Sequence, residues 1–352
     1  MTPSDRQWID HVLRSEWIAP ESPGPLRPRM VSPDEIDVGR WRISTRETTA
    51  ARPNDPFDES LNVCFLHDDW KVIPLKVYRP LVYYAAFGQP DIFACLRIAV
   101  QSLLDFGQWM HDIAVLTRSE DLGAVHQTLS PMGLGDRLHV VTVPGVDMLD
   151  WCLARYRIDA ARLFRTHQPI LYLDTDVVCD GPLDPFCLAL ARSSMVEAKA
   201  EGALGEGHPE SDGHWFGWRL MAADGMAFDP SERGFSSGIL GFANVGVAGT
   251  AFDAILRCAY GHAERTGDRR HYAGFDQPIA NYVLRKLSLF SPAQLDATAS
   301  FYRVQSGPTP LPGPHRPRGL VHFNGAVGDA PSKRGAMERY LSFLLSQRAT
   351  HG

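Results

Sequence analysis

Between residues 81 and 174, short apolar runs alternate with segments of helical spacing, and this alternation constrains the fold more than any other feature of the sequence. The runs have the length and composition of buried strands. They are 81–86, 112–116, 139–143 and 169–173, and the helical segments include 90–106 and 147–165. Strands that alternate with helices form mostly parallel sheets with right-handed crossovers. We therefore predict an α/β fold with a mixed, mostly parallel sheet flanked by helices.

Residues 1–78 lack this alternation and contain many prolines. Apolar residues at helical spacing predict a helix over 7–17. Two apolar runs, 61–66 and 70–77, predict a hairpin. We expect residues 1–78 to form an N-terminal extension and residues 79–347 to form one catalytic domain.

Composition and charge disfavour several classes of protein. The 352 residues of the chain are 44% hydrophobic and show no compositional period, which excludes collagen-like and disordered chains. The net charge of −6 disfavours a nucleic-acid binder that neutralises phosphates. No apolar run is long enough for a membrane span, and the N-terminus does not resemble a signal peptide. The six cysteines form no C-x-x-C pair and indicate reduced thiols, so we expect a soluble, cytoplasmic protein.

The fourth predicted strand leads into two carboxylates one residue apart, Asp174 and Asp176. Parallel sheets bind ligands beyond the carboxyl ends of their strands, and two carboxylates there can hold one hard cation. Roughly one D-x-D is expected by chance in a chain of this size, so a solvated turn is the competing interpretation. The position after a buried strand favours a metal site.

His322 ends a short apolar run near the C-terminus, where a histidine either packs in the core or binds a metal. Carboxylates suit Mg²⁺, Ca²⁺ or Mn²⁺, whereas an imidazole favours a transition metal. A set of Asp174, Asp176 and His322 therefore fits Mn²⁺ best, with Mg²⁺ as the alternative.

Four segments follow one another in an order that is typical of one enzyme family. They are 170–178, 234–244, 275–281 and 321–325. They resemble, in turn, the D-x-D strand, the F-N-x-G segment, the D-Q-D helix start and the H-F-x-G segment of GT-A glycosyltransferases of family 8. That family contains bacterial lipopolysaccharide galactosyltransferases and glycogenin. The resemblance covers residues 81 to about 345. It implies the Rossmann-like GT-A fold and transfer of a sugar from a nucleotide-diphosphate sugar to an acceptor hydroxyl, with retention of anomeric configuration.

The resemblance also implies roles for individual residues. Asp174, Asp176 and His322 would hold a metal that bridges the donor diphosphate and stabilises charge on the leaving group. Asp276 and Gln277 would lie beside the transferred sugar as catalytic residues, although Asp276 alone also fits a helix cap. The residues implied to bind the donor are Ala85, Ala86, Phe87, Arg157, Asp174, Ser237, Gly238, Gly325 and Lys333.

Some positions depart from the family pattern or fit a second interpretation. The family's first strand ends in A-A-D, whose Asp reads uracil, but here Ala85–Ala86 is followed by Phe87. Phe87 either stacks on a base or packs in the core, so a UDP-sugar is the expected donor while its base stays open. The family's lysine after the metal histidine is displaced, and Lys333 or Arg334 on a longer loop would replace it. Arg157 by itself also fits a charge on a helix surface. The acceptor is not indicated.

Three other functions stay open. Residues 234–238 match G-x-S-x-G around Ser236, and Asp276 and His322 follow in the order of α/β-hydrolases. A helix should follow that serine, yet residues 239–243 are strand-like. A sugar-phosphate nucleotidyltransferase also uses carboxylates and a metal, but its Gly-rich basic N-terminal loop is not found. A nucleotide-sugar sensor would bind the donor without consuming it.

Overall fold

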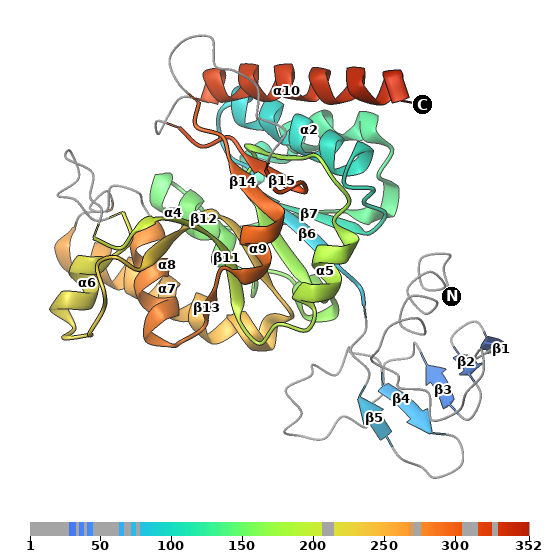
Figure 1. Cartoon of the computed structure of the whole chain (residues 1–352), viewed down its shortest axis with the longest axis horizontal. Coiled ribbons are helices and arrows are strands. Elements are labelled where there is room, and N and C mark those ends of the chain that lie inside the picture. Colours follow the sequence, from blue (N-terminus) through green and yellow to red (C-terminus); the bar gives the residue numbers. More distant parts are fainter. Residues whose placement is uncertain are drawn as a thin grey trace.

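The computed structural model describes two parts of the chain (Figure 1). In the N-terminal part it describes the strands β1 (Pro28–Ser32), β2 (Glu35–Val38), β3 (Trp41–Ser44), β4 (Val63–Leu66) and β5 (Val72–Pro74). Beyond them it describes residues 78–351 except 206–214, 268, 270–275, 305–315 and 326–329. The five N-terminal strands form one antiparallel sheet in chain order, in which β4 pairs with β5. The helix predicted over 7–17 lies outside the described residues, and the division at residue 78 stays a prediction.

A seven-stranded sheet forms the centre of the main body. Its strands, from one edge to the other, are β13 (Phe290–Ser291), β11 (Val196–Ala203), β12 (Arg233–Phe242), β9 (Ile170–Leu173), β6 (Leu81–Ala85), β7 (Asp112–Thr117) and β8 (Leu138–Thr142). Strands β9, β6, β7 and β8 are parallel, and β11 is parallel to β13. Only β12 runs antiparallel to both of its neighbours. The predicted mixed, mostly parallel sheet is confirmed.

The chain order reverses between β6 and β9. From β6 the chain proceeds through β7 to β8 at one edge, and β9 then returns to the opposite side of β6. Leu81 pairs with Ile170, and Tyr83 pairs with Tyr172, so the two carboxyl ends lie next to each other. Loops that leave such a switch point diverge and create a crevice for a ligand. The D-x-D follows β9 at this point.

Helices cover both faces of the sheet (Figure 1). They are α2 (Pro90–Asp105), α3 (Leu122–Leu129), α4 (Met148–Leu153), α5 (Asp184–Leu190), α6 (Trp218–Ala223), α7 (Val245–Thr266), α8 (Gln277–Lys286), α9 (Ala293–Thr298) and α10 (Ala330–His351). Helices α2, α3 and α10 pack on one face with Val82 and Tyr84, while α4, α7 and α8 pack on the other with Leu81 and Tyr83. Successive side chains of a strand point to opposite faces. Strands buried on both faces must therefore be apolar throughout, which explains the continuous apolar runs of the sequence.

Residues 147–165, predicted as one helix, are helical only at their start. Helix α4 is followed by short 3₁₀ turns at Ala154–Tyr156 and Arg162–Thr166. In the first of these turns, Nε of Arg155 donates a hydrogen bond to the carbonyl of Cys152 at 3.0 Å. Apolar spacing does not reveal such a change, because the α-helix and the 3₁₀ turn both bury one side of the segment. Further 3₁₀ turns span Ser119–Asp121, Ser130–Met132 and Gly135–Arg137.

A three-stranded sheet follows the D-x-D directly. It consists of β10 (Val177–Cys179), β15 (Leu320–His322) and β14 (Ala299–Phe301). Antiparallel pairing of β10 with β15 places Val177 opposite His322. The amide of Phe323 also donates to the carbonyl of Asp176 at 2.9 Å. This small sheet therefore brings His322 to the D-x-D. Among the described residues, none of the helices combines the length and apolar character that a membrane crossing requires.

Asn281 ties α8 to β12 from a fully buried position. Its Oδ1 accepts from the amide of Phe235 at 2.9 Å, and its Nδ2 donates to the carbonyls of Phe235 at 2.9 Å and Gln277 at 3.0 Å. The residue therefore satisfies both peptide groups of a buried strand position and sets the start of α8 against it.

We expect Asn281→Ala to lower the free energy of unfolding by about 3 kcal/mol, because it leaves buried peptide groups of Phe235 unpaired. Urea denaturation monitored by circular dichroism measures the change. As a control, Arg257→Ala on α7 removes an exposed ion pair with Asp253 and should change the stability by less than about 0.5 kcal/mol. A loss that small for Asn281→Ala would contradict the role assigned to its hydrogen bonds.

Candidate functional site

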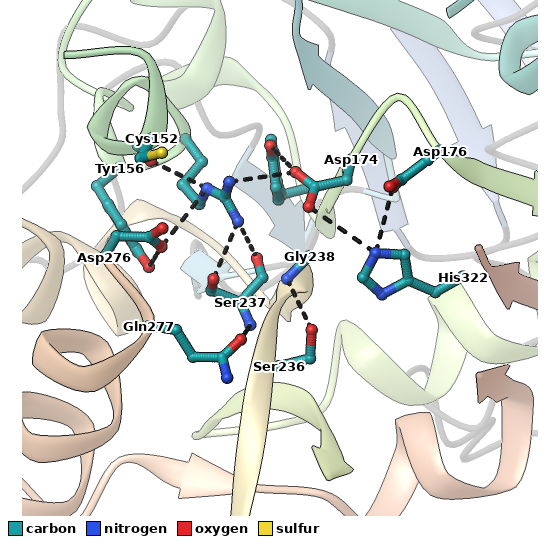
Figure 2. Close-up of polar contacts among 12 residues, drawn as sticks. Cys152, Tyr156, Asp174, Asp176, Ser236, Ser237, Gly238, Asp276, Gln277 and His322 are labelled. Atoms are coloured by element: carbon teal, nitrogen blue, oxygen red, sulfur yellow. Dashed lines mark hydrogen bonds and ion pairs between the residues drawn. The ribbon is translucent and has the colours of Figure 1, made fainter. Parts of the chain in front are cut away.

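Asp174, Asp176 and His322 lie together beyond the carboxyl end of β9 (Figure 2). One possible ligand atom from each side chain lies within 4.8 Å of the others. The Nε2 atom of His322 is 3.2 Å from Oδ1 of Asp176 and 4.0 Å from Oδ2 of Asp174. Oδ1 of Asp176 is buried, and this imidazole nitrogen is its polar neighbour. Two carboxylates and an imidazole that converge in this way fit a divalent cation.

Gly238 of β12 makes room for this set. A Cβ atom at this position would lie 2.4 Å from Cε1 of His322 and 2.8 Å from Oδ2 of Asp174. The carbonyl of Gly238 also accepts a hydrogen bond from the amide of Asp174 at 2.8 Å. Glycine is therefore required here because any side chain would push the histidine and the aspartate apart.

Each of the two aspartates has a fixed cation beside it. Nη2 of Arg155 is 3.3 Å from Oδ1 of Asp174, and Nζ of Lys333 is 2.6 Å from Oδ2 of Asp176. Burial raises the pKa of Asp176, but Lys333 and His322 outweigh burial and leave this pKa below its usual range. Burial also raises the pKa of Asp174, and Arg155 opposes this rise only in part. Burial lowers the pKa of His322, yet the two carboxylates leave it raised.

Arg155 connects the D-x-D to a second buried carboxylate, Asp276. Its Nε is 3.6 Å from Oδ2 of Asp276, and the hydroxyl of Tyr156 donates to the same oxygen at 2.6 Å. Nη1 of Arg155 donates to the carbonyl and hydroxyl oxygens of Ser237 at 2.8 and 3.0 Å. Asp276 precedes α8 without capping it through its side chain. The helix-cap interpretation is therefore wrong, and its carboxylate serves the cluster.

Gln277, Glu201 and Asn324 extend the polar cluster beyond Ser237. Oε1 of Gln277 accepts from the amide of Ser237 at 3.3 Å, as Figure 2 shows. Glu201 in β11 accepts from Nδ2 of Asn324 at 3.2 Å and also pairs with Gln277. Burial raises the pKa of Glu201. The arrangement offers carboxylate and amide groups, which are suited to sugar hydroxyls, next to a cation site.

Comparison with solved structures identifies the fold. No protein-family model matches the chain, and no curated protein matches it in sequence. The apo structure of the WbbM bifunctional glycosyltransferase matches it with a TM-score of 0.50 at 14% identity, over 76% of this chain and 51% of that one. The chain has the GT-A fold. It spans about half of the WbbM chain.

Two further matches have lower TM-scores. The galactosyltransferase LgtC, in complex with donor and acceptor sugar analogs, has a TM-score of 0.46 at 17% identity, over 76% of this chain and 95% of that one. Mouse xyloside xylosyltransferase 1 has a TM-score of 0.42 at 12% identity, over 70% and 97% of the two chains.

The GT-A sheet gathers most of the predicted site residues around one cluster. They are Asp174, Asp176, Ser237, Gly238, Asp276, Gln277, His322 and Lys333. Gly325 adjoins it, since a Cβ there would lie 3.9 Å from Cε of Lys333. Arg157 instead has its guanidinium 5.8 Å from the ring centre of Tyr260. The sequence led to Arg157 and not to Arg155, two positions earlier. The signal that was available, an arginine shortly before the D-x-D, fits both residues.

At the carboxyl end of β6, Ala85 and Ala86 lead into Phe87, which is buried. The ring of Phe87 stacks parallel to that of Trp151, with the ring centres 6.0 Å apart. Phe87 therefore packs in the core against α4, which is one of the two positions that the sequence predicted for it. The roles of Ala85, Ala86, Phe87 and Arg157 toward a donor stay predictions.

Ser236 does not have the setting of a hydrolase nucleophile. It lies within β12, a strand that continues to Phe242, rather than at a turn from strand to helix. Its hydroxyl accepts from the amide of Gly238 at 3.3 Å, while His322 and Asp276 face Asp176 and Arg155. The hydrolase interpretation is thus contradicted, because the strand-to-helix elbow that exposes such a serine is absent here.

We expect Gly238→Ala to weaken Mn²⁺ binding by about 10- to 100-fold, because the new methyl group displaces Asp174 and His322 from each other. Isothermal titration calorimetry measures the affinity. Gly249→Ala on α7 is the matched control, since its Cβ would meet only Cγ1 of Val245 at an ordinary 3.5 Å. Unchanged Mn²⁺ binding by Gly238→Ala would mean that these side chains do not hold the metal.

Proposed function

We propose that the protein is a metal-dependent glycosyltransferase that moves a sugar from a nucleotide-diphosphate sugar to an acceptor hydroxyl. The convergence of Asp174, Asp176 and His322 at the switch point of a GT-A sheet carries this proposal. The mixed carboxylate and imidazole set suits Mn²⁺, with Mg²⁺ as the alternative. When bound, the cation supplies Lewis-acid stabilisation of the charge on the departing diphosphate.

The residues around the metal site would hold the donor in one orientation. Arg155 pairs with both Asp174 and Asp276. It therefore fixes the position of the metal ligand Asp174 relative to Asp276, the carboxylate proposed to contact the sugar. Such preorganisation matters because misplaced groups lose most of their effect on a transition state. Lys333, which pairs with Asp176, would add positive charge near the diphosphate. Ser237 and Gly238 would line the donor pocket between these groups.

Asp276 and Gln277 are proposed to contact the transferred sugar. Both come from the start of α8, and Gln277 is oriented by the amide of Ser237. Glu201, which pairs with Gln277 and with Asn324, would receive the acceptor hydroxyl together with Asn324. Retention of anomeric configuration and a UDP-sugar donor are supported by the resemblance of the four sequence motifs to family 8.

Asp176→Asn tests the function directly. Removing one charged metal ligand should lower metal-stimulated release of nucleoside diphosphate from a nucleotide-sugar by about 100- to 1000-fold, and a chelator should abolish this release in the wild type. A thermal-shift screen of nucleoside diphosphates and nucleotide-sugars with Mn²⁺ first selects the donor, because a bound ligand stabilises the folded state.

The control is Asp253→Asn on α7, where the carboxylate is exposed and paired with Arg257 in the same helix. Its turnover should match the wild type. Metal-independent turnover that is unchanged in Asp176→Asn would refute the mechanism.

A further inference from the structure

The ammonium group of Lys333 pairs with the Asp176 carboxylate of the candidate metal site and is largely shielded from solvent. Its Nζ is 2.6 Å from Oδ2 of Asp176, and only 20% of its side chain is exposed. The contact uses one oxygen of Asp176, while the other oxygen faces His322 at 3.2 Å. Lys333 therefore restricts Asp176 to one free ligand atom and places an ammonium group beside any cation bound there.

Two cations already offset most of the negative charge around the two aspartates. Arg155 and Lys333 lie 3.3 and 2.6 Å from Asp174 and Asp176, and Arg155 is shared with Asp276. With His322 neutral, as metal binding requires, these three carboxylates and two cations leave one net negative charge. A divalent cation that enters alone reverses the sign of that charge and meets repulsion from the two nearby cations. A diphosphate that enters with it supplies the missing negative charge.

We propose that Lys333 is a counter-cation that makes metal binding conditional on a diphosphate ligand. This inference rests on the proposed function and goes beyond it by naming what couples the two ligands. A lysine ammonium is a compact charge on a flexible stem with three donors, so it can serve both Asp176 and a phosphate oxygen. The diphosphate thus relieves the repulsion between Lys333 and the metal, and the two ligands bind cooperatively. By linkage the metal raises diphosphate affinity by the same factor.

The neighbouring Arg334 provides a matched control. It occupies the same turn of α10 and carries the same charge, but its Nη1 pairs with Asp91 at 2.6 Å instead of with the D-x-D. Its side chain is 43% exposed, so its loss removes a cation from this end of α10 without changing the partners of Asp176.

The experiment titrates Mn²⁺ into the full chain by calorimetry and by loss of the free-ion electron paramagnetic resonance signal, with and without saturating UDP or GDP. The wild type should bind Mn²⁺ alone weakly, and the better nucleoside diphosphate should tighten binding by at least about tenfold. Lys333→Met should bind Mn²⁺ alone about tenfold more tightly and lose most of the enhancement. Arg334→Met should behave as the wild type.

Two further variants separate charge from packing. Lys333→Gln retains a hydrogen-bond donor without the charge and should resemble Lys333→Met, which also keeps the test valid if Lys333→Met does not fold. Lys333→Arg retains the charge and should preserve the coupling. The inference is overturned if Mn²⁺ affinity and enhancement are unchanged in Lys333→Met and Lys333→Gln, or if Arg334→Met changes them equally. If no nucleoside diphosphate binds to the wild type with Mn²⁺, the proposed function fails instead.

Discussion

The buried guanidinium of Arg155 is the interaction on which the organisation of the site depends. It is 9% exposed and lies between Asp174 and Asp276, which come from segments of the chain far apart in sequence. A buried charge is tolerated only when it is paired and hydrogen-bonded. Arg155 and the two carboxylates therefore need one another, and any displacement of α8 or of the end of β9 would leave a charge unpaired. This requirement fixes the position of Asp174, after β9, relative to Asp276, at the start of α8.

The second constraint is the close approach of strands around the D-x-D. The turn after β9 leads directly into β10, which pairs with β15 and so delivers His322. Gly238 then lets β12 pass beside His322 and Asp174 without a side chain between them. The large sheet positions the aspartates and the small sheet positions the histidine. The candidate metal site is the place where the two sheets meet.

Features that depend on neighbouring residues in the sequence could be predicted, whereas features that depend on contacts between distant segments could not. The sheet could be predicted because strands buried on both faces must be apolar throughout, and Asp174 interrupts such a strand at its end. His322 was a candidate from its place at the end of a short apolar run, but a lone histidine fits core packing equally well, and the ordered motifs favoured metal binding. Arg155 was missed because a 3₁₀ turn replaces the expected helix and turns a nominal surface residue inward. Glu201 was missed because its partners, Gln277 and Asn324, reach it only through tertiary packing.

The net charge of −6 has a different meaning once the site is known. It argues against a polyanion that covers a large surface, but the proposed diphosphate ligand would experience the local charges of the site. Those charges are three carboxylates and two cations, which leave one net negative charge: Asp174, Asp176, Asp276, Arg155 and Lys333. Buried ion pairs of this kind are poor sources of stability, because the cost of desolvation offsets their attraction. In the proposed function their effect is instead on selectivity, since a nearly balanced site favours neither a lone cation nor a lone anion and best accommodates the two together.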